Sequence, residues 1–274
     1  MNNQELDFGR RFGGVARMHG GAGLSAFTAA RVCVVGVGGV GSWAAEALAR
    51  SAIGTLTLID PDSIAESNTN RQLHALGDAY GQAKVDAMRS RILAINPLCK
   101  LSVVEDHLSP ENMATLFAGH DIVLDAVDDV PMKIAMAVYC QDNKLPLVVC
   151  GGAGGKSDPA SIRISDLSRT EQDPMLAKVR SRLRKEYGSI RGFPRDPRRK
   201  FGIEAVYSVE PLQQPVLCEA DGTAPQRLSC AGYGSDVCVT ASFGFFAASR
   251  VLAQLRERAS PPMTSQPLVA TGEV

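Results

Sequence analysis

The 274-residue sequence has no net charge, because 29 lysines and arginines balance 29 aspartates and glutamates. Composition alone therefore requires no polyanionic partner. The seven cysteines form no CxxC pair and have no histidine at ligand spacing, which argues against a structural zinc site. An odd number of scattered cysteines indicates reduced thiols in a cytoplasmic protein.

Nor does the sequence contain a segment that predicts export or membrane insertion. Residues 1–17 are polar and lack the apolar core of a signal peptide. The apolar run 237–255 is interrupted by Arg250, and its uncharged part is shorter than the roughly 20 residues that cross a bilayer. We therefore predict a buried amphipathic helix there and no transmembrane segment.

What the sequence does contain is a glycine-rich segment between a predicted buried strand at 32–35 and a predicted helix at 42–50. This layout presents backbone N–H groups at a helix N-terminus to phosphates. The residues concerned are Gly36, Gly38, Gly39, Gly41 and Ser42. Asp60 ends the next predicted strand, 19 residues after Gly41, where a carboxylate can bind ribose hydroxyls. By itself the segment is compatible with NAD, FAD or ATP.

Alternating strand and helix patterns predict an α/β fold with a Rossmann-like, doubly wound and mostly parallel sheet. The strands are uninterrupted apolar runs, which indicates a sheet covered on both faces. Further strands are predicted at 55–59, 101–104, 122–126, 147–150, 161–165 and 202–209, and helices at 80–95, 111–117, 131–143, 173–187 and after Asp236. We divide the chain into an N-terminal arm and helix (1–30), a nucleotide-binding core (31–155), a C-terminal part with a basic insertion and a final packed helix (156–259), and a disordered tail (260–274).

Charged residues after the second and fourth predicted strands form a second group of candidates. Arg71 lies in the long loop after the second strand, Lys84 in the first turns of the next helix, and Asp128 after the fourth strand. The carboxyl ends of such strands converge on one crevice, so these side chains are predicted to surround the glycine segment. A nucleoside triphosphate needs cations for its phosphates and a carboxylate for its Mg²⁺. An NAD-dependent oxidoreductase would leave the three residues without a role.

The motifs GxGGxGS, DxD, NxNRQ, GxxK and DAVDD, in this order, resemble the adenylating family related to ubiquitin-activating E1 enzymes over roughly residues 10–155. RFGGVAR, NTNRQLHAL, GGAGG and a final helix containing FGF resemble one branch over nearly the whole chain, the bacterial tRNA threonylcarbamoyladenosine dehydratases. That resemblance implies ATP-dependent cyclisation of threonylcarbamoyladenosine in tRNA through an acyl-adenylate of its carboxylate.

Two alternative functions are compatible with the same site. The first is an adenylyltransferase that activates the C-terminal glycine of a ubiquitin-like sulfur-carrier protein, although the CxxC pairs of those enzymes are missing here and the basic insertion also argues against it. The second is a non-catalytic RNA-binding or sulfur-relay partner that keeps the nucleotide site as a relic. An intact set of motifs disfavours it.

The resemblance implies a site for ATP and Mg²⁺. Arg71 and Lys84 would contact the triphosphate and Asp128 would ligate Mg²⁺. The other ATP-binding candidates would cradle the nucleotide, with Asp60 on the ribose and Asn68 on the nucleotide or its Mg²⁺: Gly36, Gly38, Gly39, Gly41, Ser42, Asp60, Asp62, Asn68, Asn70 and Gln72. From the residues alone, Asp125 and Asp129 compete with Asp128, and Arg71 and Lys84 are compatible with solvated surface cations.

The resemblance further implies a homodimer, because in this family an N-terminal arginine of the partner subunit reaches the γ-phosphate. Arg17 is the first choice for that arginine. Arg11 is the second, because the spacing within RFGGVAR does not settle the register.

A basic segment between Lys178 and Lys200 carries ten lysines and arginines against two acidic residues, a net charge of +8. Most charge runs are solvated surface. Here Tyr187, Phe193 and Phe201 are interspersed where bases could stack, and with the resemblance this favours RNA, with no DNA partner. The RNA-binding candidates are Arg180, Arg182, Arg184, Lys185, Arg191, Arg195, Arg198, Arg199 and Lys200.

Cys230 is a candidate thiol, because it precedes a glycine-containing segment that could expose it to a cysteine desulfurase or sulfur-acceptor system. No neighbouring base or cation marks it as a nucleophile. The four histidines have no partners at ligand spacing and are predicted to be surface or structural residues: His19, His74, His107 and His120.

Overall fold

The computed structural model describes residues 7–188, 192–213 and 233–259, which contain one seven-stranded sheet in the order β3-β2-β1-β4-β5-β7-β6. The strands are β1 (Arg31–Val35), β2 (Thr55–Ile59), β3 (Lys100–Val104), β4 (Ile122–Asp125), β5 (Leu147–Cys150), β6 (Ile162–Asp166) and β7 (Glu204–Ser208). Neighbouring strands pair in parallel except β6, which runs antiparallel to β7. The predicted doubly wound, mostly parallel sheet is confirmed.

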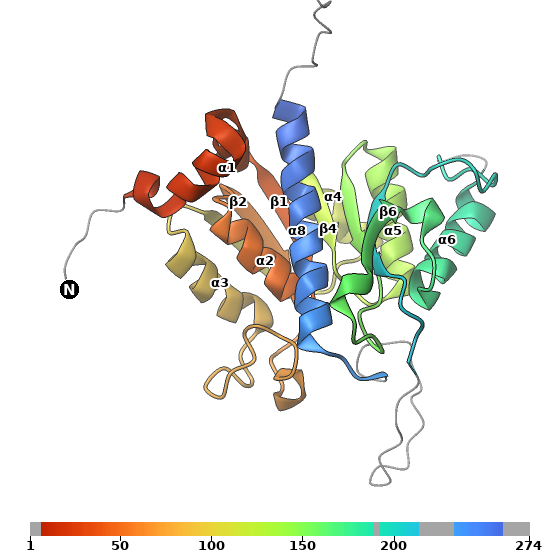
Figure 1. Cartoon of the computed structure of the whole chain (residues 1–274), viewed down its shortest axis with the longest axis horizontal. Coiled ribbons are helices and arrows are strands. Elements are labelled where there is room, and N and C mark those ends of the chain that lie inside the picture. The colour runs from red at the N-terminus through yellow and green to blue at the C-terminus, as the bar shows by residue number, and fades with distance from the viewer. Residues whose placement is uncertain (1–6, 189–191, 214–232, 260–274) are drawn as a thin grey trace, which may run out of the picture.

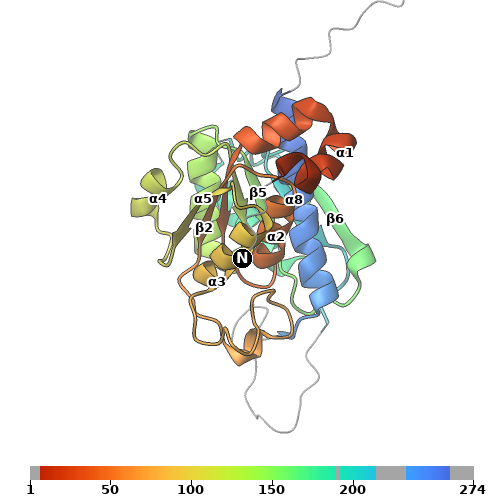
Figure 2. The same ribbon diagram turned by 90° about the vertical axis from the view of Figure 1, so that its left-hand side faces the viewer.

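Helices cover both faces of this sheet (Figure 1). They are α1 (Phe8–Ala29), α2 (Gly41–Arg50), α3 (Lys84–Ile95), α4 (Pro110–Leu116), α5 (Val130–Asp142), α6 (Pro174–Tyr187) and α8 (Val237–Ala259). Figure 2 shows α4 and α5 on one side of the sheet and α1, α2 and α8 on the other. Alternate strand residues enter opposite cores: Val32 and Val34 of β1 pack with α2, α3 and α8, whereas Cys33 and Val35 pack with α4, α5 and α6.

Local sequence signals explain several helix starts. The Ser109 side chain accepts a hydrogen bond from the backbone N–H of Asn112 at the start of α4, as its position before Pro110 predicts. Asp129 caps α5 in the same way and Asp173 caps α6. The last two caps lie at the carboxyl end of the sheet, beside the site described below.

One boundary differs from the sequence prediction in a way that matters for the site. The helix predicted at 80–95 begins only at Lys84. Gly81 has a φ of +86°, which a right-handed helix cannot contain, and the backbone N–H of Lys84 donates to the carbonyl of Asp62. Residues 61–83 therefore form a loop that returns to the end of β2, and Lys84 stands at the helix start.

Helix α8 packs against α1, α2, β5 and β7. By length and composition alone it is long and apolar enough to cross a membrane, a property that buried core helices share. Its buried residues, among them Val239, Phe243 and Val251, belong to the core on the α2 face of the sheet, as predicted for a packed helix. Gly244 lies so close to α2 that a Cβ there would approach the Val40 carbonyl oxygen to 2.5 Å. The glycine of the FGF motif thus permits close helix packing.

Candidate functional site

A cavity of about 570 Å³ lies at the carboxyl ends of β1, β2, β4 and β5. Its walls are the glycine segment after β1, the loop after β2, residues 126–129 after β4 and residues 150–154 after β5. Where the connections after two neighbouring parallel strands run to opposite faces of the sheet, they leave such a crevice at the carboxyl ends of the strands. Its volume is within the range of small-molecule sites.

The glycine segment forms one wall. Gly36 adopts a φ of +85°, and a Cβ there would lie 2.9 Å from the Ala126 carbonyl group. Gly36, Gly38 and Gly39 line the cavity, and their contact with phosphates stays a prediction. Gly41 and Ser42 do not line it. Gly41 instead allows α2 to approach the Gly36 carbonyl oxygen, only 1.8 Å from where its Cβ would be, and Ser42 is buried with its Oγ accepting from Leu73 N–H.

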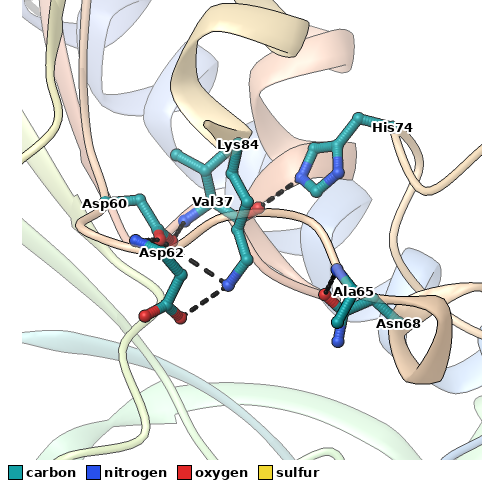
Figure 3. A network of polar contacts seen from close by, with 7 residues as sticks. All are labelled: Val37, Asp60, Asp62, Ala65, Asn68, His74 and Lys84. Carbon is teal, nitrogen blue, oxygen red and sulfur yellow. Dashed lines mark hydrogen bonds and ion pairs between the residues drawn. The ribbon is translucent and has the colours of Figure 1, made fainter. Parts of the chain in front are cut away.

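Two aspartates and a lysine form a hydrogen-bonded network beside the glycine segment (Figure 3). The Asp60 carboxylate accepts from the backbone N–H groups of Val37 at 2.6 Å and Asp62 at 3.0 Å. Lys84 Nζ lies 2.6 Å from Asp62 Oδ2 and 3.6 Å from Asp60 Oδ1. Lys84 and Asp60 are buried, so Lys84 is not a solvated surface cation. Its ammonium is held at a fixed place in the cavity wall.

The loop after β2 contributes Asn68, Arg71 and Gln72 to the lining. Arg71 Nη1 donates to the Ser67 carbonyl and to Asn70 Oδ1, both at 2.9 Å, so its guanidinium is oriented by its own loop. Asn70 itself does not line the cavity. The Asn68 side chain accepts from the Ala65 N–H and stabilises the turn that carries the loop (Figure 3).

The structure separates the three aspartates that competed for a metal. Asp125 is fully buried and pairs with Lys133 at 2.9 Å; burial raises its pKa, against the effect of Lys133. Asp129 accepts from the Met132 N–H as the cap of α5. Asp128 lines the cavity with an exposed side chain, and within the described residues its carboxylate has no hydrogen-bond partner. Of these three aspartates, Asp128 is the one available to a ligand.

These residues fit Mg²⁺ that arrives with a nucleotide. No group of three or more histidine, cysteine, aspartate or glutamate residues is close enough to hold a metal within the described ranges. Mg²⁺ bound with a nucleotide uses one or two carboxylates together with phosphate oxygens and water. The open carboxylate of Asp128, in the turn that contacts the glycine segment at Ala126, matches that requirement.

The opposite wall contains two buried charged residues that sequence reasoning missed. Asp173 accepts from the backbone N–H groups of Leu176 and Gly152, at 2.9 and 2.8 Å, and burial raises its pKa. Lys156 Nζ donates to the carbonyls of Gln172 and Glu210, and burial lowers its pKa. Apart from Leu176, their partners are distant in sequence. The signals that could have found them are the place of Lys156 directly after GGAGG and the helix-cap pair Asp173-Pro174.

Neither N-terminal arginine lines the cavity of its own chain. Arg11 Nη1 donates to the carbonyls of Ala94 and Ile95 at the end of α3, where a cation is favourable. Arg17 is exposed, and no partner for its guanidinium is found in the described part of the chain. Of the two, Arg17 is the one that remains available to another molecule.

The basic segment begins on α6 and continues in the loop before β7. Along α6 a surface hollow is lined by Arg180, Arg184, Lys185 and Arg195. Arg180 donates to Thr170 Oγ1 and Arg184 to the Ser168 carbonyl, so these two are partly engaged within the fold. The other described cations of the segment are exposed: Lys178, Arg182, Lys185, Arg195, Arg198, Arg199 and Lys200.

The prediction that aromatic residues of this segment stack on bases is wrong for two of them. Phe193 and Phe201 are buried, with ring centroids 5.2 Å apart, in the core on the α5 face of the sheet. Tyr187 is partly buried against the same core. Phe193 and Phe201 anchor the loop in the core, whereas most of its described cations are exposed.

The two histidines with a hydrogen-bond partner on the ring, His74 and His120, have the structural role predicted for them. His74 Nε2 lies 2.8 Å from the Val37 carbonyl, and His120 Nε2 lies 2.9 Å from Thr57 Oγ1. His107 is exposed and lines the cavity.

Three predictions concern residues outside the described ranges, namely Arg191, Cys230 and the tail 260–274. A sulfur-transfer role for Cys230 with a desulfurase system stays a prediction.

Comparison with known proteins adds relatives of similar length. A family model described as ThiF family matches residues 11–266. The tRNA threonylcarbamoyladenosine dehydratase of Escherichia coli (strain K12) is 46% identical over 259 residues, 92% of this chain and 95% of that protein. The dehydratase of Haemophilus influenzae is 46% identical over 255 residues, 93% and 96% of the two chains. A crystal structure of the E. coli dehydratase in complex with ATP has a TM-score of 0.82 and 45% identity, covering 92% of this chain and 96% of that one.

Proposed function

Because the chain belongs to the ThiF family, we propose that it is an enzyme that uses ATP to dehydrate threonylcarbamoyladenosine in tRNA. One observation carries the proposal. The cavity brings a glycine segment, the fixed cations Arg71 and Lys84 and the open carboxylate Asp128 together, in a chain that is 46% identical to two such dehydratases over 95% and 96% of their length. The adenylyltransferase alternative is not favoured by these relatives.

The arrangement suits the first half of the reaction, formation of an acyl-adenylate. ATP would lie on Gly38 and Gly39 with its phosphates toward Arg71 and Lys84. The substrate carboxylate attacks the α-phosphorus and pyrophosphate leaves. The charge on that leaving group is stabilised by cations that are already in place before the reaction, so little reorganisation is needed. Mg²⁺ held by Asp128 would neutralise phosphate charge in the same step.

The second half of the reaction needs little from the protein. The carbamoyl nitrogen attacks the activated carbonyl carbon of the same nucleoside, its proton is released and AMP leaves. A nucleophile in the same molecule has a high effective concentration, so ring closure requires mainly that the substrate be held and water excluded. The carboxylate has then lost one oxygen to AMP, and the nucleoside is lighter by one water.

The direct test combines purified protein with Mg-ATP and tRNA that carries threonylcarbamoyladenosine, followed by mild digestion and mass spectrometry. We expect a nucleoside lighter by one water, and only when ATP is present. ATP binding with an unchanged nucleoside would reject the dehydratase proposal. The next substrate to test would then be the C-terminal glycine of a ubiquitin-like sulfur carrier.

The exposed cations along α6 support a tRNA-binding role for this face. Replacing both Lys185 and Arg195 by glutamine is expected to raise the KM for tRNA about tenfold and to lower the slope of log affinity against log salt by about two, because each cation neutralises one phosphate. The KM for ATP should not change. Lys100→Gln, at the amino end of β3, is the matched control. An unaltered salt slope in the double variant would exclude this face.

We further propose that the protein is a cytoplasmic homodimer in which Arg17 of one subunit reaches the ATP site of its partner. The exposure of Arg17 and its absence from the cavity of its own chain support this arrangement.

A further inference from the structure

Lys133 and Asp125 form an ion pair buried beneath the cavity. Both side chains have 0% exposure. Lys133 Nζ donates to Asp125 Oδ1 at 2.9 Å and to the Cys150 carbonyl at 2.7 Å. Removing two charges from water is costly, and an apolar pair of similar volume is often more stable. An ion pair in this place therefore calls for a reason other than stability.

The two bonds of Lys133 reach two neighbouring parts of the cavity wall, which follow the adjacent strands β4 and β5. Asp125 Oδ1 also accepts from the Val127 N–H at 3.1 Å, so it holds the turn that presents Asp128. That turn touches the glycine segment at Ala126. Cys150 is the last residue of β5 and leads into residues 151–154 of the other wall. One ammonium group thus joins the wall with Asp128 to the neighbouring wall after β5.

We propose that Lys133 is a positioning residue for adenylation, which fixes the separation of these two walls so that the substrate carboxylate and the α-phosphate of ATP approach in line. The inference rests on the proposed function. Reactions of two bound groups are sensitive to their placement, and a displacement of about 1 Å can cost about a hundredfold in rate. Lys133 itself touches neither reactant.

A purely structural role predicts a different outcome, and a double variant separates the two. Lys133→Met leaves the Asp125 charge buried without a partner and is expected to lower the melting temperature strongly. Adding Asp125→Asn removes that charge, while the side-chain amide oxygen that it introduces can still accept from the Val127 N–H. The melting temperature should then return most of the way to that of the unmodified protein. The double variant then lacks only the hydrogen bond from residue 133 to the Cys150 carbonyl.

The measurement is ATP–pyrophosphate exchange in the presence of tRNA bearing threonylcarbamoyladenosine. We expect the double variant to lose about 10- to 100-fold in kcat, with the KM for ATP within about twofold, because the phosphate-binding residues are untouched. Arg91→Met is the matched control, since it deprives the buried Glu46 of a partner at 2.6 Å far from the cavity. It should lower the melting temperature and leave kcat unchanged.

Recovery of kcat together with the melting temperature in the double variant would show that Lys133 only neutralises Asp125, and would overturn the proposal. Hydrogen exchange gives a readout that does not depend on turnover. Amides at 126–129 and 151–154 should exchange faster in the double variant than in the unmodified protein, and equal rates would also overturn it. If the unmodified protein shows no pyrophosphate exchange, the proposed function fails, and the amide rates still decide whether Lys133 holds the two walls.

Discussion

Asp128→Asn is expected to reduce ATP-dependent dehydration by a factor of about 10²–10³, the usual effect of removing one group that stabilises charge in a transition state. Asparagine keeps the size of the side chain but is a far weaker ligand for Mg²⁺. Within the described residues Asp128 has no partner, so the free energy of unfolding should change by no more than about 0.5 kcal/mol. The measurements are the rate of nucleoside conversion and the melting temperature of each protein.

Asp129→Asn is the matched control for this prediction. It removes a neighbouring carboxylate of the same turn, and asparagine still caps α5 through the Met132 N–H. Its conversion rate should stay close to that of the unmodified protein. Raising the Mg²⁺ concentration should restore part of the activity of Asp128→Asn only if residual metal binding persists. A fully active Asp128→Asn protein would place the metal, and the site, elsewhere.

Arg17→Ala is expected to produce a loss of similar size, and the lost activity should reappear when this chain is paired with the Asp128→Asn chain. In a heterodimer of the two, one site combines an intact Asp128 with the Arg17 of the other subunit, whereas the second site lacks both. The purified heterodimer should therefore have about half the activity of the unmodified dimer. The heterodimer is obtained by co-expressing the two chains with different affinity tags and purifying over both.

Arg11→Ala provides the comparison. It removes two hydrogen bonds at the end of α3, so it should lower stability by about 1–2 kcal/mol while leaving the chemistry intact. If the heterodimer stayed as inactive as its two parents, the arginine would act within its own subunit or not at all. If Arg11→Ala, rather than Arg17→Ala, needed the partner chain for activity, the assignment within RFGGVAR would move to Arg11.

Much of the sheet and one wall of the site could be predicted from the sequence, because their signals are local. Apolar runs predicted the strands, and the glycine segment with Asp60 predicted the ligand-facing edge of β1 and β2. Lys84 was expected in that crevice. Its pairing with Asp62 was not, because it requires the helix to begin after Gly81, whereas the sequence predicted a helix start at residue 80.

The rest depended on which side chains become buried or paired in the folded chain. Sequence alone could not decide among three aspartates, since the choice rests on Lys133 pairing with Asp125 eight residues earlier and on Asp129 capping α5. The burial of Phe193 and Phe201 was hidden because neither belongs to a strand or helix with a readable period. Only the sheet order, which inserts β7 between β5 and β6, brings that loop onto the core.

The contact of Gly244 with the Val40 carbonyl joins residues about 200 positions apart in the chain. It places the last described helix against the N-terminus of α2, the helix that follows the glycine segment. During synthesis the N-terminal part emerges first, and long-range contacts form late. A growing chain would hold its nucleotide loop without this support until α8 has left the ribosome. We therefore expect the cavity to reach its final form only near the end of translation.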